Sequence, residues 1–470
     1  MVRVRKAGAI EGELGLAPAF MLLAASVSVS ACEQARELPV TVLFPADTSD
    51  LLRANNASLV LRPNGDTYSF AVSGLQFSLE LEGEPSTALQ QLELYLAADD
   101  ELLAWGSTPP FSTAGPDIGL AVFLGRPGAL SSWPTALDSP DPKLLATEAL
   151  ARGMLMVEAD GDTFLLNHYT LQIEAGARLP DTVGFAPDDG GLFSARDGSV
   201  IRLAWEQVVA SAWRYDPGAD RWTLLELDMA ESIGLRPGAA TLVDPDRSRI
   251  YVLGGGEATD AVAIDLVPTA AGVLQVALVE GITLDHPRVG ATAIWIPTAD
   301  NPTADALIIG GEQPGPLALR TSSGELVGPE LGWRDLACAL ESSPPEGSEP
   351  ASISCFGGLL DALPTADAAH FTIRAGEPIE LTLSESFLPV ALAEPLLFTD
   401  ATALYAQGEG RWFRIERGSQ TVEAPSSAAK RARGGHLVSL ANGATFLVGG
   451  VDQDGVALER WQVFMPDLER

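Results

Sequence analysis

Few residues of this chain have the type and spacing that catalysis requires. The 470-residue sequence contains 4 histidines, and it has neither the Gly-x-Ser-x-Gly turn that exposes a nucleophilic serine nor a glycine loop that could cradle phosphate. Three carboxylates that could act as general acid and base follow apolar runs that end in glycine, namely Glu312, Glu409 and Asp452. Carboxylate pairs hydrolyse glycosides, so a carbohydrate-active enzyme is the catalytic alternative, although no spacing among the three residues requires it.

Two of the 3 cysteines are predicted to form a disulfide. Cys338 and Cys355 flank residues 342–349, a segment with two prolines and Gly347 that has the composition of a hairpin connection. The midpoint of the two cysteines falls inside this segment, so an antiparallel pairing would place them directly opposite each other, within reach of a disulfide. Two buried free thiols are the alternative. Without a nearby histidine the pair cannot complete a tetrahedral zinc site, and no metal is expected there.

Three turns are rich in carboxylates: residues 160–162, 244–246 and 452–455. Their oxygens could bind calcium, but none of the turns completes the twelve-residue loop with a distal bidentate glutamate. An aspartate in a tight turn also accepts the backbone N–H two residues ahead. Plain β-turns are therefore the preferred interpretation, and no cofactor is expected.

Charge and composition limit the kinds of partner and the fold classes that the chain can have. The 29 basic and 63 acidic residues give a formal charge of −34, spread along the chain. Such a chain repels phosphate backbones and anionic headgroups, which excludes nucleic acid as a partner. The 46 Gly and 33 Pro, with 20% charged residues, fit many short strands and turns. Since no stretch beyond the N-terminus keeps a period of 3.6, we expect an all-β protein.

Gly-Gly pairs close apolar runs at regular intervals. The first glycines of the four pairs are separated by 310 − 254 = 56, 357 − 310 = 47 and 449 − 357 = 92 residues. The last interval is twice 46, which predicts a degenerate unit in between, at residues 403–408 followed by Trp412. Residues 199–203 and 162–166 have the character of two further units without glycines. The pairs are Gly254-Gly255, Gly310-Gly311, Gly357-Gly358 and Gly449-Gly450.

The most complete unit spans residues 427–464 and resembles the kelch motif. Its characteristic residues are Arg431, Arg433, Gly435-His436, Asn442-Gly443, Gly449-Gly450 and Glu459-Arg460-Trp461. The aromatic-turn-aromatic ending of a kelch unit also occurs at Trp213, Tyr215 and Trp222. The resemblance implies a β-propeller of six or seven blades, with seven favoured.

The resemblance also implies structural roles for these residues. The glycines permit positive φ and close approach of strands, and the aromatic that ends each unit covers one blade where it packs on the next. His436 and His286 occupy corresponding parts of two units, so we interpret both as structural. Copper-containing oxidases resembling kelch propellers use a cysteine crosslinked to a tyrosine; the pairing of Cys338 with Cys355 argues against that chemistry here.

The N-terminus predicts export. Arg3, Arg5 and Lys6 precede an apolar run at residues 16–29, which has the length of a signal-peptide core and is too short to span a membrane. The run ends in Val-Ser-Ala-Cys32, which resembles the bacterial lipobox and implies lipidation of Cys32; an ordinary cleaved signal is the alternative. Glu33 is not the aspartate that retains enterobacterial lipoproteins at the inner membrane, so the outer membrane or cell surface is expected.

Residues 33–115 are predicted to form a small immunoglobulin-like β-sandwich. Five short strands, several of them alternating apolar with polar residues, are expected at 38–44, 57–61, 68–72, 77–81 and 92–96. The proline-rich residues 116–142 are the expected junction, and the strand at 120–124 within them is predicted to complete the blade that ends at 461–464. The expected organisation is thus a leader at 1–32, the sandwich, the junction, and a propeller at 143–470.

Together these features predict a lipid-anchored scaffold of the cell envelope. A monomer is expected to present loops of its propeller to an envelope protein or polysaccharide, without catalysis, because variable loops on a rigid ring are common binding sites. The lipid anchor would be its only contact with the membrane.

Overall fold

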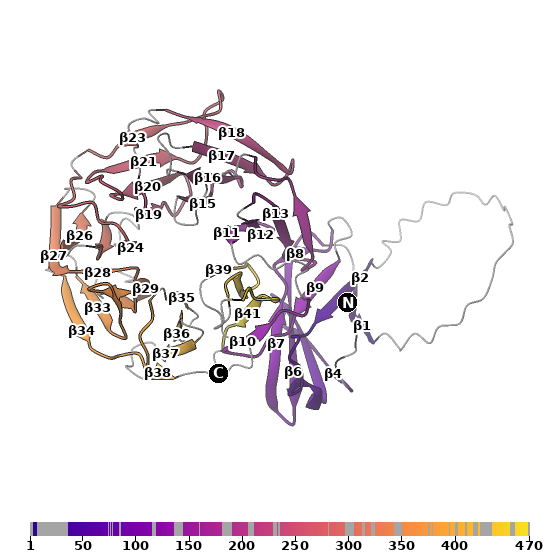
Figure 1. The fold of residues 1–470 in the computed structure, drawn as a ribbon. Coiled ribbons are helices and arrows are strands. Elements are labelled where there is room, and N and C mark those ends of the chain that lie inside the picture. Colours follow the sequence, from indigo (N-terminus) through magenta and orange to yellow (C-terminus); the bar gives the residue numbers. More distant parts are fainter. Residues whose placement is uncertain are drawn as a thin grey trace. The chain divides into compact units, whose positions relative to one another are not determined.

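The computed structural model of the chain is all-β (Figure 1). It describes residues 3–6, 36–73, 75, 77, 79–83, 86–114, 119–135, 144–158, 160–180, 190–204, 211–228, 233, 236–280, 282–296, 305–312, 315–320, 325–342, 350–374, 377, 379–393, 395–399, 403–408, 411–416, 422–423, 435–451 and 456–468. Two compact units are formed, one by residues 1–126 with 168–172 and the other by 127–167 with 173–470. Within the described ranges, none of the helical segments is long and apolar enough to cross a membrane.

The first unit contains two sheets with one shared core. One sheet has the order β1 (Arg3–Lys6), β5 (Leu79–Gly83), β2 (Arg36–Leu43), β9 (Leu120–Phe123). The other has the order β4 (Asp66–Ala71), β3 (Asn56–Arg62), β6 (Leu89–Ala98), β7 (Glu101–Ser107), with β8 (Phe111–Ser112) also paired to β6. Alternate residues such as Leu59 and Leu94 are buried between them, because side chains of a strand point to opposite faces in turn.

The prediction for residues 120–124 was wrong. β9 pairs in parallel with β2, with Val42 opposite Val122, and all four of its residues are buried. The strand that completes the last sheet of the second unit is instead β10 (Ala129–Ser132), which pairs with β41 (Gln462–Met465). An apolar run predicts that a strand is buried, but it does not predict which strand it pairs with. The sequence pattern alone therefore could not show whether residues 120–124 or residues 129–132 complete the last sheet.

The second unit is a succession of antiparallel meanders. Among the described residues, seven sheets have four or five strands and one has three. The first three of the larger sheets contain β11 (Leu144–Leu150), β12 (Gly153–Glu158), β13 (Thr163–Asn167) and β14 (Ile173–Gly176); then β15 (Gly190–Ser194), β16 (Val200–Ala204), β17 (Ser211–Asp216), β18 (Arg221–Leu227) and β22 (Val273–Leu274); then β19 (Ala240–Val243), β20 (Arg249–Leu253), β21 (Ala261–Asp265) and β23 (Val276–Leu278). The next two contain β24 (Thr292–Ile296), β25 (Asp305–Ile309), β26 (Gly315–Arg320) and β27 (Glu325–Leu331); then β29 (Ala337–Ser342), β30 (Ala351–Phe356), β33 (Ala368–Ile373) and β34 (Glu380–Ser384). The last two contain β35 (Leu396–Thr399), β36 (Ala403–Gly408), β37 (Arg411–Glu416) and β38 (Val422–Glu423); then β39 (His436–Ser439), β40 (Thr445–Val448), β41 and β10. The small sheet is β28 (Trp333–Arg334), β31 (Leu359–Leu360) and β32 (Leu363–Pro364).

These sheets give the second unit a propeller-like fold. In Figure 1 they follow one another in chain order around a centre, and β39 contacts both β35 and β11, so that the last sheet meets the first. The apolar clusters lie between neighbouring sheets: Leu155 of β12 packs in one cluster with Val200 of β16, and Phe356 of β30 packs in another with Leu404 of β36. Each sheet thus buries its faces against its neighbours, which a single four-stranded sheet cannot do alone.

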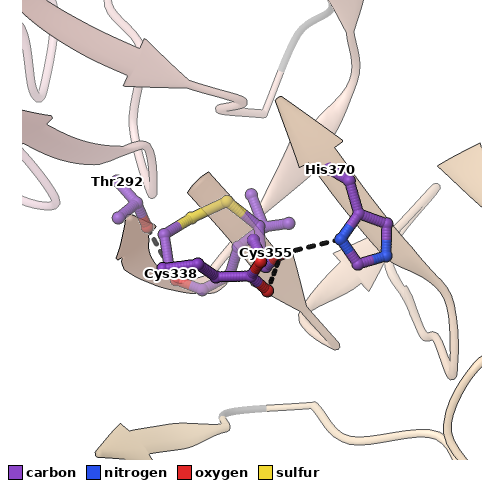
Figure 2. Close-up of a disulfide and its surroundings, with 7 residues drawn as sticks. Thr292, Cys338, Cys355 and His370 are labelled. Atoms are coloured by element: carbon purple, nitrogen blue, oxygen red, sulfur yellow. Dashed lines mark hydrogen bonds between the residues drawn. A yellow bond between two sulfur atoms is a disulfide. The ribbon is translucent and has the colours of Figure 1, made fainter. Parts of the chain in front are cut away.

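The predicted disulfide is confirmed. Cys338 in β29 and Cys355 in β30 are direct partners in the antiparallel register, their Cα atoms lie 4.1 Å apart, and their sulfurs are bonded (Figure 2). The bond joins the first two strands of one sheet, and Cys355 is fully buried.

Candidate functional site

Three of the four Gly-Gly pairs lie where neighbouring sheets make close backbone contacts. Gly254, Gly310 and Gly357 directly follow β20, β25 and β30, the second strand of their sheets, and each has a φ between 62° and 73°. A Cβ on Gly310 would lie 1.5 Å from the carbonyl oxygen of Trp333, so no larger residue fits. This close approach is what allows the hydrogen bonds described next.

In three of the four pairs, the second glycine donates its N–H to the segment that leads into the following sheet. Gly255 donates to Pro287 at 2.6 Å, Gly311 to Trp333 at 2.7 Å, and Gly358 to Leu392 at 2.7 Å. The leading segments are also linked to each other, because Gly290 donates to the carbonyl of Gly238 at 2.9 Å and Asp335 donates to that of Gly290 at 2.8 Å. Loops from successive sheets therefore form one continuous, hydrogen-bonded border, which we call the Gly-Gly rim: residues 236–239, 254–260, 285–291, 310–312, 333–336 and 357–358.

Two arginines of the rim are buried and donate hydrogen bonds to its backbone carbonyls. Arg236 and Arg288 each precede the first strand of a sheet and are 1% exposed. Arg236 donates to the Gly254 carbonyl at 3.3 Å and to Asp260 Oδ1 at 2.6 Å. Arg288 donates to the Gly310 carbonyl at 3.0 Å and is paired with the Asp285 carboxylate at 3.0 Å. A buried guanidinium is stable only when its donors are satisfied in this way.

Three further polar side chains of the rim are paired with its carboxylates or with one another. Arg334 lies 3.1 Å from Glu312 Oε1 and 3.7 Å from Asp335 Oδ2, and His286 Nδ1 lies 2.9 Å from Asp285 Oδ2. Glu312 remains 54% exposed. Acidic, basic and imidazole groups thus alternate along a rigid border, an arrangement suited to hydrogen bonding with a polar ligand.

The carboxylates of the enzymatic alternative are not brought together by the described structure. Glu312 lies on the Gly-Gly rim in its ion pair with Arg334, whereas Glu409 and Asp452 lie outside the described residues. Of these three carboxylates, the described residues thus include Glu312 alone.

The sequence did not predict a set of three hydrogen-bonded polar side chains near the disulfide. Ser354 Oγ lies 2.5 Å from Glu341 Oε1 and 2.7 Å from His370 Nδ1. His370 is labelled near the disulfide in Figure 2. Burial lowers the pKa of His370, and the charge of Glu341 opposes that shift. Ser354 is 1% exposed, whereas Glu341 and His370 are half-buried, and we interpret the three hydrogen-bonded side chains as a structural network. The three residues come from β29, β30 and β33, and only the strand register reveals that they meet.

The remaining histidines lie in different segments of the chain. His286 belongs to the Gly-Gly rim, and His436 begins β39 opposite Val448. His168 is buried against the ring of Tyr169, with centroids 4.3 Å apart.

The aromatic residues of the kelch-like pattern pack between sheets. Tyr215 is fully buried and Trp222 is 7% exposed, with their ring centroids 5.0 Å apart. Trp222 Nε1 donates to the carbonyl of Ala177 at 3.0 Å, which ties its sheet to the preceding one. Trp213 packs against the same cluster, and Trp461 lies 6.4 Å from Trp133 between centroids.

The acidic turns have the geometry of β-turns where they are described. Asp160 Oδ1 accepts the N–H of Asp162 at 2.9 Å, and Asp246 Oδ1 accepts that of Ser248 at 3.1 Å. Residues 452–455 lie outside the described part, as do the lipobox-like segment and Cys32. In the ranges that the structure describes, no three His, Cys, Asp or Glu side chains gather in a group that could hold a metal ion.

Comparisons with known proteins leave the family open. No protein-family model matches the chain, and no curated protein matches it in sequence. Similar solved structures include a virginiamycin B lyase from Staphylococcus aureus, with 13% identity over 71% of this chain and 98% of that one and a TM-score of 0.43. The extracellular domain of a putative hybrid two-component system from Bacteroides thetaiotaomicron shows 12% identity over 88% of this chain and 53% of that one, with a TM-score of 0.46. Similarity at this level carries no information about the activity of this chain.

Proposed function

We propose that this protein is a lipid-anchored scaffold of the cell envelope that binds a partner protein or a polysaccharide through the Gly-Gly rim. In this proposal the second unit is a seven-bladed kelch-type propeller, with one blade for each of the larger sheets, and the first unit is a β-sandwich that joins it to a lipidated Cys32. The outer membrane or cell surface is its location, and the protein acts without catalysis.

One observation carries the proposal: the loops of the rim are fixed before any ligand arrives. The inter-sheet hydrogen bonds of 2.6–2.7 Å and the buried guanidiniums of Arg236 and Arg288 hold the backbone of the rim in place. Glu312, Arg334 and Asp335 remain partly exposed on it. A preorganised polar border loses little conformational freedom on binding, which favours recognition.

The test uses soluble protein comprising residues 33–470. Binding to a glycan array and to fractionated envelope proteins is measured for this protein and for Glu312→Gln and Arg334→Gln. Asp246→Asn is the matched control, because Asp246 is an exposed carboxylate that pairs with Arg196, outside the rim, and asparagine keeps its turn hydrogen bond. We expect a ligand whose binding is weakened by both rim variants and unchanged by the control, with no change in the ligand itself.

Turnover would overturn the proposal in favour of the enzymatic alternative. The decisive result is release of new reducing ends from any array sugar, abolished by Glu312→Gln and retained by Asp246→Asn. For location, mass spectrometry of the envelope fraction should find a lipidated Cys32; an intact residue 1–32 segment would refute the anchor.

A further inference from the structure

A short hairpin with exposed leucines continues the Gly-Gly rim. β31 and β32 pair antiparallel, with Leu360 opposite Leu363. β31 also pairs with β28, where Trp333 is the register partner of Leu360. We call residues 359–364 the leucine hairpin, and residues 357–358 of the rim directly precede it.

The leucines of the hairpin form an apolar row that extends from the core to the surface. Residues opposite each other in a sheet share a face, so Trp333, Leu360 and Leu363 lie on one side of this small sheet. Their exposure rises from 2% at Trp333 through 38% at Leu360 to 69% at Leu363. Ala362 is exposed as well, and Asp361 is the single charged residue of the hairpin. A run of exposed apolar residues is disfavoured on a protein surface unless it meets a partner.

The base and the turn of the leucine hairpin are both fixed. Thr365 N–H donates to the Gly358 carbonyl at 3.0 Å, and Leu392 N–H donates to that of Thr365 at 3.0 Å. At the turn, Asp361 has a φ of 50° and Ala362 a φ of 63°, the two positive values of a type I′ turn. Glycine or asparagine is usual there, and alanine is disfavoured. An unfavourable backbone conformation held in place by its surroundings is typical of a functional surface.

The charges of this small sheet and its ion pairs favour a basic partner. Asp361 is exposed at the turn of the hairpin. Glu312 and Asp335 share the guanidinium of Arg334, which is in register with Leu359. Of the four charged side chains, three are thus carboxylates, and a basic group of a partner would be attracted to them. A second copy of the hairpin would instead bring like charges together, and an anionic lipid headgroup would be repelled.

We propose that the leucine hairpin docks a polypeptide segment of a partner protein in which a large apolar side chain neighbours a basic one. The inference rests on the proposed function and narrows its ligand from a protein or polysaccharide to a protein. Leu360 and Leu363 receive the apolar side chain, and the carboxylates around them attract the basic one. A polysaccharide fits less well, because sugar hydroxyls placed against leucines lose their hydrogen bonds to water without replacement.

The experiment selects peptides from a random phage-displayed library on protein 33–470 and measures the binding of the enriched peptides by fluorescence anisotropy. The variants are Leu363→Ser, which removes the most exposed apolar side chain of the hairpin, and Asp361→Asn, which keeps a residue that tolerates positive φ. Leu383→Ser is the matched control, because Leu383 is 55% exposed and lies on β34, in another sheet. Urea midpoints verify that all variants are folded.

We expect enriched peptides in which an apolar residue adjoins Lys or Arg. Leu363→Ser should weaken their binding about tenfold, the effect of one leucine that is no longer buried in the complex. Asp361→Asn should weaken it about threefold, and Leu383→Ser should leave it unchanged. Equal binding to Leu363→Ser and to the wild type, or enrichment without basic residues, overturns the inference.

Two further measurements test the other occupants. A dimer in solution, or binding to phosphatidylcholine vesicles, that Leu363→Ser abolishes would overturn the inference, because the hairpin would then serve a second copy or a lipid surface. A selection that enriches no peptide, while the glycan array finds a sugar that binds the rim, overturns the inference and leaves the proposed function standing. When neither finds a ligand, both fail.

Discussion

Replacing Gly310 by alanine tests the packing between neighbouring sheets most directly. Gly310 has a φ of +73°, and a Cβ there would lie 1.5 Å from the carbonyl oxygen and 2.7 Å from the carbonyl carbon of Trp333. Backbone atoms cannot rotate away as a side chain can, so the segment around Trp333 must shift. That shift breaks the hydrogen bond from Gly311 N–H to Trp333 O.

The size of the effect follows from three contributions. A positive φ costs an L-residue roughly 1–2 kcal/mol, loss of the hydrogen bond costs about 1 kcal/mol, and the forced backbone shift costs about 1–3 kcal/mol. The sum is about 4 kcal/mol. Gly272→Ala is the matched control, because Gly272 has a φ of +79° and its Cβ would meet nothing within 4 Å; it should cost only about 1 kcal/mol, the conformational part.

The assay is urea and thermal unfolding of protein 33–470, followed by tryptophan fluorescence, to which the 9 tryptophans contribute, among them Trp333 at 2% exposure. At roughly 2 °C per kcal/mol for a domain of this size, Gly310→Ala should lower the melting temperature by about 8 °C and Gly272→Ala by about 2 °C. Equal losses for the two variants would refute the close approach of sheets at the Gly-Gly pairs.

Three further outcomes are expected. Replacing Cys338 and Cys355 together by alanine should lower the free energy of unfolding by about 3 kcal/mol, because the bond closes a loop with a sequence separation of 17; an unchanged urea midpoint would contradict this. Arg288→Met should cost about 2 kcal/mol, since it leaves the buried Gly310 carbonyl without this donor and removes one of the two partners of Asp285, whereas Arg196→Met, at a side chain 72% exposed, should change the midpoint little. Burial holds the pKa of His370 below its unfolded value of 6.5, so the unfolded chain takes up this proton more readily, and the stabilising effect of the neutral ring, complete above pH 6.5, is lost as the pH falls. His370→Gln should therefore be less sensitive than the wild type between pH 7 and pH 5, and parallel pH profiles would exclude His370 as the cause.

Much of the β-structure follows from local patterns. The alternation at residues 57–61 and 92–96 placed β3 and β6, since one face of each strand is buried. The midpoint of Cys338 and Cys355 fixed their register, because a short hairpin leaves little freedom in how its strands align. The regular Gly-Gly spacing marked where second strands end in three of the sheets, including the run before Gly310.

The candidate site depended on contacts between distant segments. Glycine signals that the backbone can approach something closely, but only the fold identifies Trp333 as the neighbour of Gly310. In the same way, the sequence did not indicate that Arg288 would be buried within the rim or that Glu341, Ser354 and His370 would meet across three strands.

The sequence by itself determined the all-β class, the positions of many strands and the disulfide, because strand periodicity, turn chemistry and hairpin symmetry act over a few neighbouring residues. Only the tertiary structure decided which strand completes the last sheet, which loops form the rim and which charges pair there. These features depend on packing and hydrogen bonding between residues that are tens to hundreds of positions apart, such as β10 with β41. A local sequence pattern does not predict such contacts.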